Sequence, residues 1–425
     1  MNRTKSLLRM MALAILSGAM ILGAASRAMA DKIHLKDGRV LEGTVEKQGN
    51  GYVYFRYKIG GIEQSQMFTS DEFSSIEKDE TAKPEGDKAS EAKPKAAAAG
   101  KRGATKIAIL NFGPSSVWSD KVGDMVGVHI STEAFKNAVP MLEKEGFGKN
   151  DIVVIRINSG GGYVLETNKF QELFQNVYKK KFRTVAWVES AISAAAMSPY
   201  PLEEMYFLPE GNLGACTAWG GALQAVKDIQ LEQILATMEI VSRQAGRDPK
   251  IMRSMQIMEP LSASVDPVTG EVTWFQDETS GDTCLNHKGH ILTLTAPDAV
   301  RFKFAKGIAK DKDELAKAMG LTEVEWAGQN ASEYVDNFMR EAEKTEKKFD
   351  EVLSQYIMAL QLAQSARDRQ ERAAQVGRAR GFLNQMEKWI GLNPNFQFHF
   401  AGRVGALLDK EWFEIQRERL KDLMK

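Results

Sequence analysis

The first part of the chain carries the pattern of short β-strands. Apolar residues between 33 and 45 flank the turn signal Lys36–Gly38, and Tyr52–Tyr57 alternates aromatic or apolar residues with polar ones. Gly60–Gly61 separates this run from the next. Alternation with a period of two is typical of strands that bury one face. We therefore predict a small all-β domain at residues 31–78, a pattern equally compatible with a binding module and with a passive spacer.

The middle of the chain alternates apolar, β-rich runs with stretches of helical spacing. The strand-like runs are Lys106–Phe112, Ile152–Ile157, Thr184–Val188 and Met205–Leu208. Between two of them, Phe170–Tyr178 places its apolar residues at helical spacing. This alternation is typical of βα units around a mostly parallel sheet. We therefore predict an α/β core domain at residues 106–320, with Ser264–Lys288 as an added hairpin.

Beyond residue 320 the pattern becomes helical and charged. One apolar stripe at helical spacing is formed by Phe349, Leu353, Tyr356, Leu360 and Ala363. Charged residues occupy most of the positions between them, so we predict a helical C-terminal region at residues 321–425. The pattern fits a helical arm for oligomerisation or partner docking as well as it fits a helical layer packed on the chain's own core.

The first thirty residues have the features of an export signal. Basic residues open the chain, Met10–Leu22 is an almost unbroken apolar run, and Ala28–Ala30 supplies the small residues that a signal peptidase reads. The run is shorter than the roughly 20 residues of a membrane-spanning helix. We predict a signal peptide at residues 1–30 and an exported protein, in the periplasm or on the extracytoplasmic face of the membrane. An uncleaved anchor would give the same location.

Composition and charge exclude several classes of protein. The 425 residues include 56 basic and 56 acidic side chains, so the net charge is zero, which argues against nucleic acid as a partner. A hydrophobic fraction of 43% suits a protein that buries a core. Residues 79–105 differ, because they are rich in Ala, Lys, Glu and Pro without apolar periodicity. This composition predicts a disordered linker.

The cysteines and most of the histidines give no sign of a metal site. Cys216 and Cys284 are too few for a disulfide scaffold or a cysteine zinc site. His287 and His290 have no acidic partner nearby at ligand spacing, so we expect no metal and no cofactor. Because the protein is predicted to be exported, a disulfide between Cys216 and Cys284 is compatible with its location.

Three features of the core domain carry chemistry. Ile157–Gly162 ends a strand in three consecutive glycines, whose backbone N–H groups can face a cleft and receive an oxyanion. Val185–Ala196 runs from a strand into small residues around Ser193, where a hydroxyl can be exposed at the start of a helix. Met205–Ala215 is a further strand that ends in a glycine turn. Alone, a glycine loop usually only turns the chain, and a serine among alanines usually packs in a helix.

Together with Gly289–Ala299, these features resemble the Clp/crotonase superfamily, most of all the NfeD-type (ClpP-class) membrane serine proteases and the SppA signal peptide peptidases. That family has a strand ending in Ser-Pro-Gly-Gly, a nucleophilic serine before small residues, a Leu-Gly-Ala turn and a Leu-Thr-Leu-Thr-Ala segment that opens a helix. Thr295 and Asp298 also fit the N-cap of that helix. The resemblance covers residues 106–320.

The resemblance implies a fold and a site. The fold is α/β, with a ClpP/crotonase-like core of repeated ββα units. A small barrel precedes it, since Lys36–Gly43 resembles the start of SH3-like or Sm-like barrels, and a helical tail follows it. In the site, Ser193 is the implied nucleophile and Gly161 and Gly162 are the implied oxyanion donors. Gly160 stands where the family has proline.

The base that activates the serine is implied to be a lysine. No histidine lies between Ser193 and His287, whereas NfeD-like relatives use a lysine, which acts as a base when burial keeps it neutral. The lysines in that stretch are Lys227 and Lys250. Lys227 lies near the start of the family's lysine-bearing helix, although a few residues off its spacing and beside Asp228. Lys250 lies in a polar turn and is expected to be solvated.

The leading hypothesis is therefore an exported serine endopeptidase with a Ser193–Lys227 dyad. Its substrates would be membrane-associated or unfolded polypeptides, and the resemblance also implies a homo-oligomer with a link to the membrane. The alternative is a catalytically inactive ClpP-fold scaffold or interaction protein of the cell envelope. Acyl-CoA chemistry of the crotonase type ranks third, since its acidic catalytic residues have no evident counterpart here.

Overall fold

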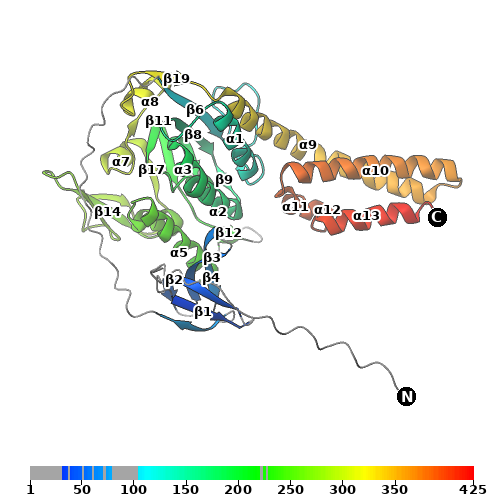
Figure 1. The fold of residues 1–425 in the computed structure, drawn as a ribbon, viewed down its shortest axis with the longest axis horizontal. Coiled ribbons are helices and arrows are strands. Elements are labelled where there is room, and N and C mark those ends of the chain that lie inside the picture. Colours follow the sequence, from blue (N-terminus) through cyan, green and yellow to red (C-terminus); the bar gives the residue numbers. More distant parts are fainter. Residues whose placement is uncertain are drawn as a thin grey trace, which may run out of the picture. The chain divides into compact units, whose positions relative to one another are not determined.

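The chain forms two compact units in a computed structural model, residues 1–98 and 99–425 (Figure 1). The structure describes residues 31–36, 39–49, 52–59, 62–69, 73–78, 104–220, 224–225 and 228–425. The predicted signal peptide and nearly all of the predicted linker lie outside the described residues. So does Lys227. Within the described part, no helix is both long and apolar enough to span a membrane.

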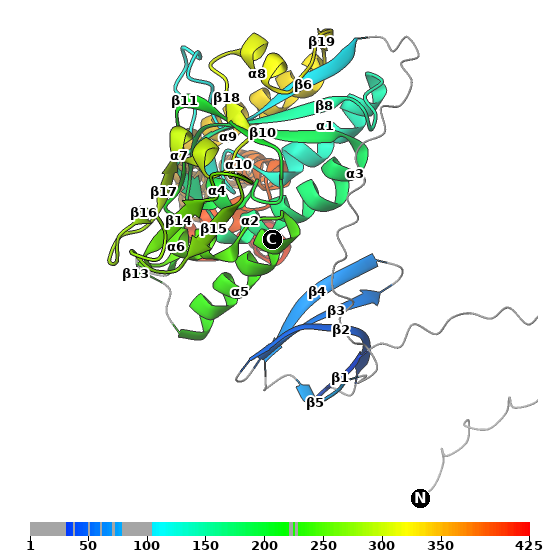
Figure 2. The ribbon, with the colours of Figure 1, turned by 90° about the vertical axis from the view of Figure 1, so that its left-hand side faces the viewer.

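The first unit is an antiparallel sheet. Its strands are β1 (Asp31–Leu35), β2 (Val40–Gly49), β3 (Tyr52–Ile59), β4 (Ile62–Thr69) and β5 (Phe73–Glu77). They pair in the order β4-β3-β2-β1-β5, and one face buries a small apolar cluster around Ile33, Phe55 and Phe68 (Figure 2). The strand predictions are confirmed. Within the described residues no pairing joins β4 to β5, so closure into a barrel stays a prediction.

The second unit is built on a mostly parallel sheet. Its central strands are β6 (Thr105–Phe112), β8 (Ile152–Ser159), β10 (Arg183–Ile192) and β11 (Met205–Gly214), and all four predicted runs lie in them. Neighbours in the order β6-β8-β10-β11 are parallel (Figure 2). Because the carboxyl ends of parallel strands share one edge of a sheet, the loops after β8, β10 and β11 gather there.

Short strands complete the sheet at both sides. β19 (Val324–Trp326) and β18 (Gly307–Ile308) run parallel to β6 and β11, and β17 (Thr293–Thr295) is antiparallel to β11. The three residues of β19 correct the prediction that the chain beyond residue 320 is helical. Propensity could not reveal this strand, because it owes its conformation to hydrogen bonds with β6, more than 200 residues away in the sequence.

Helices cover both faces of this sheet. On one face lie α1 (Thr132–Lys144), α2 (Val164–Leu173) with the π-helical turn η1 (Phe174–Tyr178), α3 (Lys179–Lys181) and α4 (Ala194–Met197). Aromatic side chains fill the space between α1, α2 and β6, where the rings of Phe112 and Phe135 lie 4.8 and 5.3 Å from that of Phe170. On the other face α8 (Lys312–Ala318) packs against a second cluster that includes Val154 and Trp187.

The stretch between β11 and β17 adds α5 (Asp228–Gln244), α6 (Pro249–Gln256) and a three-stranded sheet. In that sheet β14 (Leu261–Val265) pairs with β15 (Val272–Phe275) and with β16 (Thr283–Asn286), so the predicted hairpin is confirmed. A further short pair consists of β12 (Trp219–Gly220) and β13 (Gln224–Ala225). Helix α7 (Ala296–Arg301) follows β17, and its N-cap is Thr295, whose hydroxyl accepts from the Asp298 N–H as predicted.

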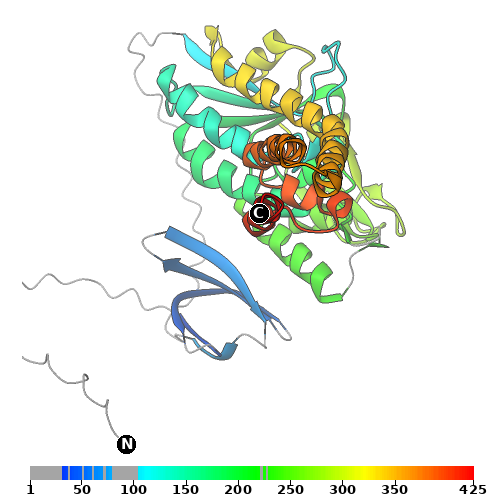
Figure 3. The same ribbon diagram turned by 90° about the vertical axis from the view of Figure 1, so that its right-hand side faces the viewer.

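The C-terminal helices divide between core and arm. They are α9 (Gln329–Ser365), α10 (Arg369–Leu392), α11 (Phe396–His399), α12 (Ala401–Val404) and α13 (Lys410–Asp422). The first turns of α9 pack in the main core through Val335 and Phe338, whereas its later turns form a separate apolar cluster with α10, α11 and α13 (Figure 3). The predicted packing on the chain's own core therefore holds for the start of α9, whereas a role of the remaining helices in oligomerisation or partner docking stays a prediction. We call α10–α13 and residues 342–365 of α9 the helical arm.

A buried carboxylate joins the arm to the core. Glu166 on α2 is 1% exposed, and one of its oxygens accepts from the N–H and the hydroxyl of Thr132 at 2.7 and 2.6 Å. The other oxygen accepts from Lys169 and Asn395, both at 2.9 Å. Burial alone would raise the pKa of Glu166, but these hydrogen bonds outweigh it and lower the pKa below its ordinary value.

We expect Glu166→Gln to lower the free energy of unfolding by about 2–4 kcal/mol at pH 7. The amide NH2 group of glutamine cannot accept hydrogen bonds, whereas every polar group around the carboxylate donates one. A lowered pKa in the folded state means that the unfolded state binds more protons, so the stabilisation is complete above the ordinary pKa of 4.5. It is lost as the pH falls through the folded value. Urea unfolding of wild type and variant across the acid range measures the difference.

The control for this test is Glu172→Gln, an exposed position on the same helix. We expect it to change stability by less than about 0.5 kcal/mol at every pH, as is usual for surface sites. If the difference in the free energy of unfolding between wild type and Glu166→Gln does not decrease at acid pH, then the ionised Glu166 is not the source of the stabilisation.

Candidate functional site

Ser193 lies at a strained turn between strand and helix. It follows the last residue of β10 and precedes α4, with φ +57° and ψ −126°. Among the described residues other than glycine, only Ser193, Ala215 and Lys303 have a positive φ. L-residues avoid this conformation, which costs on the order of 1–3 kcal/mol and is typical of active-site turns that expose a serine hydroxyl. The Ser193 side chain is partly exposed.

The glycine loop after β8 lies directly against this serine. Gly161 has φ +106°, and a Cβ placed on it would come within 2.6 Å of the Ser193 Cβ and 2.8 Å of the Ile192 carbonyl oxygen. No side chain fits there, so glycine is required both for the backbone conformation and for the close approach. The structure therefore brings together Ser193 and the first of the two predicted oxyanion glycines.

The loop after β11 supports Ser193 from behind. The Ser193 N–H donates to the Gly214 carbonyl oxygen at 2.9 Å, and the Ala215 N–H donates to the Leu292 carbonyl oxygen at 2.9 Å. Leu292 directly precedes β17, the segment from which the helix with the Thr295 cap begins. All four sequence features of the resemblance thus meet around Ser193, although they lie far apart along the chain.

The backbone N–H groups of the glycine loop near Ser193 differ in whether a hydrogen-bond acceptor already engages them. The Gly161 N–H donates to the Ser159 hydroxyl at 3.1 Å. In the pairing of β7 (Met125–Val126) with β9 (Gly161–Gly162), the Tyr163 N–H donates to the Val126 carbonyl oxygen at 2.9 Å. Successive N–H groups of a strand point to opposite sides, so that of Gly162 points away from β7.

A further candidate donor, which the sequence pattern did not single out, is the N–H of Ala194. It belongs to the first turn of α4, where N–H groups have no partner within the helix. The residue after the nucleophile supplies an oxyanion donor at strand-to-helix turns of this kind. Its position directly after Ser193, at the start of a run of alanines, was the available signal.

The predicted base is only partly accounted for. Lys227 lies outside the described residues, so the dyad remains a prediction. Lys250 lies on α6, its side chain is 43% exposed, and its ammonium group pairs with Asp248 at 3.1 Å. A partly exposed side chain paired with a surface carboxylate agrees with the expectation of a solvated lysine.

The sequence left open whether the two cysteines pair, and in the structure both are free. Cys216 is buried behind the serine turn, where its sulfur lies 3.7 Å from the Ser193 carbonyl oxygen. Burial raises the pKa of its thiol, so it remains protonated. Cys284 lies on β16 of the added sheet, with its sulfur 3.6 Å from Nδ1 of His287. Each sulfur has its own local partner in a different layer, which spacing along the chain could not show.

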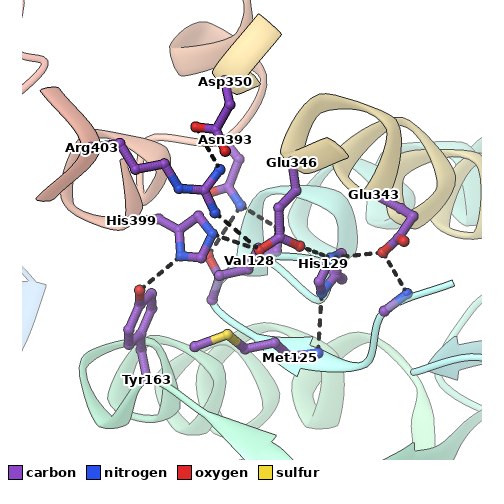
Figure 4. Close-up of polar contacts among 12 residues, drawn as sticks. Met125, Val128, His129, Tyr163, Glu343, Glu346, Asp350, Asn393, His399 and Arg403 are labelled. Carbon is purple, nitrogen blue, oxygen red and sulfur yellow. Dashed lines mark hydrogen bonds and ion pairs between the residues drawn. The ribbon is translucent and has the colours of Figure 1, made fainter. Parts of the chain in front are cut away.

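A second group of residues, with side chains of the kinds that bind metal ions, lies between the core and the arm (Figure 4). His129, Glu343 and Glu346 place possible metal-ligand atoms within 4.8 Å of one another. However, Nδ1 of His129 accepts a hydrogen bond from the Met125 N–H at 3.3 Å. With Nδ1 as an acceptor, the ring N–H is on Nε2, the nitrogen that lies beside the two carboxylates, whereas a metal there needs the Nε2 lone pair. These residues therefore fit a hydrogen-bonded group better than a metal.

A cavity of about 520 Å³ opens elsewhere, between β6, the turn at 310–312 and the start of α9. Three tryptophans line it, and each has a cation over its ring: Arg340 over Trp118, Arg156 over Trp187 and Lys312 over Trp326. Neither Ser193 nor Gly161 lines this cavity, so it is separate from the serine turn.

The fold and the serine turn together define the class. The chain is an α/β protein with a mostly parallel sheet and a strained serine at the carboxyl end of a central strand, and it resembles the NfeD-type proteins of the ClpP class. No model of a known protein family matches it. The membrane protein NfeD1b of Bacillus subtilis (strain 168) is 26% identical over 172 residues, which are 40% of this chain.

The matched part covers 34% of NfeD1b, so the chain spans about a third of the length of this curated relative. Among solved structures, a variant of the 1510-N membrane-bound stomatin-specific protease matches with a TM-score of 0.35 and 12% identity. That match covers 51% of this chain and 84% of the protease chain.

The close approach at Gly161 can be tested by adding a methyl group. We expect Gly161→Ala to lower the free energy of unfolding by more than about 2 kcal/mol, because it meets both a positive φ and a clash with Ser193. Gly246→Ala is the matched control, since Gly246 has φ +65° and nothing within 4 Å of an added Cβ. It should cost only about 1 kcal/mol in the same urea titration. Equal losses would contradict the packing of Gly161 on Ser193.

The strain at Ser193 predicts an order of stability between two variants without the hydroxyl. Glycine adopts φ +57° freely and alanine does not, so Ser193→Gly should be more stable than Ser193→Ala by about 1 kcal/mol. Thermal and urea unfolding of the two variants measure this difference. In an ordinary strand or helix the order is reversed, and a more stable alanine variant would mean that the turn is not strained.

Proposed function

We propose that this protein is an exported serine endopeptidase of the NfeD/SppA-like class, with Ser193 as its nucleophile. The observation that carries the proposal is the positive-φ turn that holds Ser193 against the glycine loop at Gly161. Backbone strain and close packing at a partly exposed serine do little for stability. In a serine nucleophile, the strained turn exposes the hydroxyl and the packing holds it in place.

The proposed mechanism begins with attack of the Ser193 hydroxyl oxygen on the carbonyl carbon of a peptide bond. Lys227, in its neutral form, takes the hydroxyl proton and later gives it to the leaving amine. The oxyanion receives hydrogen bonds from the amides of Gly162 and Ala194, with the Gly161 backbone in place beside it. Water then hydrolyses the acyl-enzyme, with the same lysine accepting its proton.

Features of the fold support this proposal at a coarser level. The element order β6-β7-α1 followed by β8-β9-α2 fits repeated ββα units of the ClpP/crotonase kind. The proposed substrates are membrane-associated or unfolded polypeptides, in line with the resemblance to NfeD-type membrane proteins. A homo-oligomer and a location outside the cytoplasm belong to the same proposal.

The second candidate is a ClpP-fold scaffold without activity. It is favoured by one contact, the hydrogen bond from the Gly161 N–H to the Ser159 hydroxyl. An amide engaged in this way is not available to an oxyanion unless the Ser159 hydroxyl turns away. In the scaffold, the first unit and the helical arm would carry the function through binding.

Labelling with a fluorophosphonate probe separates the two candidates. We expect the folded wild-type protein to be labelled and Ser193→Ala not to be. Lys227→Met should lower the labelling rate at least about 100-fold, since general-base catalysis supplies factors of that size. Lys250→Met, which removes a surface lysine paired with Asp248, should stay within about threefold of wild type.

Casein cleavage by the same proteins provides a second readout. Wild-type protein that is folded, yet neither reacts with the probe nor cleaves casein, would overturn the peptidase and leave the scaffold.

A further inference from the structure

The oxyanion loop is paired to a very short strand. β9 contains Gly161 and Gly162, and its partner β7 has only two residues, Met125 and Val126. A two-residue parallel pair has too few hydrogen bonds to hold its own position. The position of the loop therefore depends on what fixes β7 and the residues that follow it.

An imidazole ring links β7 to the arm. His129 is 5% exposed, and its Nδ1 accepts from the N–H of Met125 at 3.3 Å. Its Nε2 lies 2.9 Å from a carboxylate oxygen of Glu346 and 3.1 Å from one of Glu343, both on α9 (Figure 4). One ring therefore contacts the β7 backbone through one nitrogen and the arm through the other.

A second polar chain reaches the loop from the other side. The Tyr163 hydroxyl, one residue past β9, lies 3.0 Å from Nδ1 of His399 on α11, and Nε2 of that ring lies 2.8 Å from Glu346. Burial lowers the pKa of His399, so the ring is neutral and donates from Nε2 to the carboxylate. Burial also raises the pKa of Tyr163, so its hydroxyl stays protonated and donates to Nδ1.

The backbone between these two contacts is also held by the arm. The side-chain amide of Asn393, at the end of α10, donates to the carbonyl oxygens of Gly127 and Val128 at 3.1 and 2.8 Å. Val128 is fully buried, and it belongs to the apolar cluster of the arm rather than to that of the core. Met125 and Tyr163 pack against the same cluster.

The charged side chains around His129 do not themselves contact β7. Glu343 also accepts from the Gly123 N–H at 2.8 Å and pairs with Lys347 on its solvent side. Arg403 on α12 lies 3.4 Å from Asp350 and 3.9 Å from Glu346. The cations are thus engaged with carboxylates of the arm, and His129 is the residue that carries the connection to β7.

We propose that the helical arm fixes the oxyanion loop and that His129 is the positioning residue that transmits this constraint to the β7–β9 pair. The inference rests on the proposed function, in which Gly161 and Gly162 line the site of the oxyanion. Loss of the link would let the pair shift, so the rate constant of acylation falls while substrate binding elsewhere is kept. Control of the site by whatever binds or moves the arm follows from the same connection.

Two substitutions of His129 separate its two contacts. In His129→Gln the amide nitrogen reaches about as far as Nε2 and can contact the glutamates, but no acceptor remains for the Met125 N–H. In His129→Asn the amide oxygen replaces Nδ1 as acceptor for the Met125 N–H, but the side chain is too short to reach the arm. Lys347→Gln is the control, since it removes a cation from the solvent side of the same Glu343 carboxylate.

The experiment measures two quantities on the full-length chain. We expect His129→Asn and His129→Gln each to lower the fluorophosphonate labelling rate of Ser193 about 10- to 100-fold, and to speed amide hydrogen exchange in segments 123–131 and 159–165, because each removes one of the two contacts of the ring. Lys347→Gln should stay within about threefold of wild type in both readouts. For cleavage of a fluorogenic peptide, the loss should fall on kcat with KM unchanged.

The two readouts keep this inference separate from the proposed function. Without any labelling of wild type the peptidase fails, and local exchange alone then tests whether His129 couples the arm to the loop. Should His129→Asn not fold, Glu346→Ala removes the nearer carboxylate partner of His129 and the partner of His399 from a partly exposed position, and it should show the same pattern. Unchanged exchange in these segments would overturn the inference. So would stoichiometric Zn²⁺ binding that is lost in His129→Asn, since it would make the group a metal site.

Discussion

The positive φ of Ser193 is the constraint on which the candidate site depends. A serine in this conformation is unfavourable alone, so the surrounding structure must hold it there. Three neighbours do so: the Gly214 carbonyl oxygen accepts its N–H, Gly161 packs directly against its side chain, and α4 fixes the backbone that follows. Because these neighbours come from the ends of three parallel strands, the sheet must form before the turn is stable.

The arm extends this dependence beyond the α/β core. Met125, Val128 and Tyr163 flank the glycine loop in the sequence or in the sheet, yet their side chains pack in the apolar cluster of the arm. Buried polar groups, His129 and Glu166 among them, fix the register of that contact, because each would be costly to bury without its partners. The segments on either side of the glycine loop therefore contact the C-terminal helices as well as the core.

Sequence pattern was most informative where one local interaction decides the structure. The four central strands, the added hairpin and the Thr295 cap follow from period, turn residues and capping chemistry, and all are present. It did not reveal β19, and it left the pairing of the two cysteines open. A three-residue strand exists only through its pairing with β6, and the thiols lie in layers whose separation depends on packing. The candidate nucleophile and its glycine loop were found because each carries a local motif.

What the sequence determined by itself is a set of local preferences: which segments are strands or helices, where a glycine is needed, and which serine follows a strand into small residues. Such preferences act over a few residues, and hydrophobic period and turn chemistry encode them directly. Only the tertiary structure decided that His129 meets Glu343 and Glu346 across more than 200 residues, and that His399 of the arm meets Tyr163, the residue after the glycine loop. Contacts of this kind depend on the packing of complete helices and sheets, and no periodicity along the chain records them.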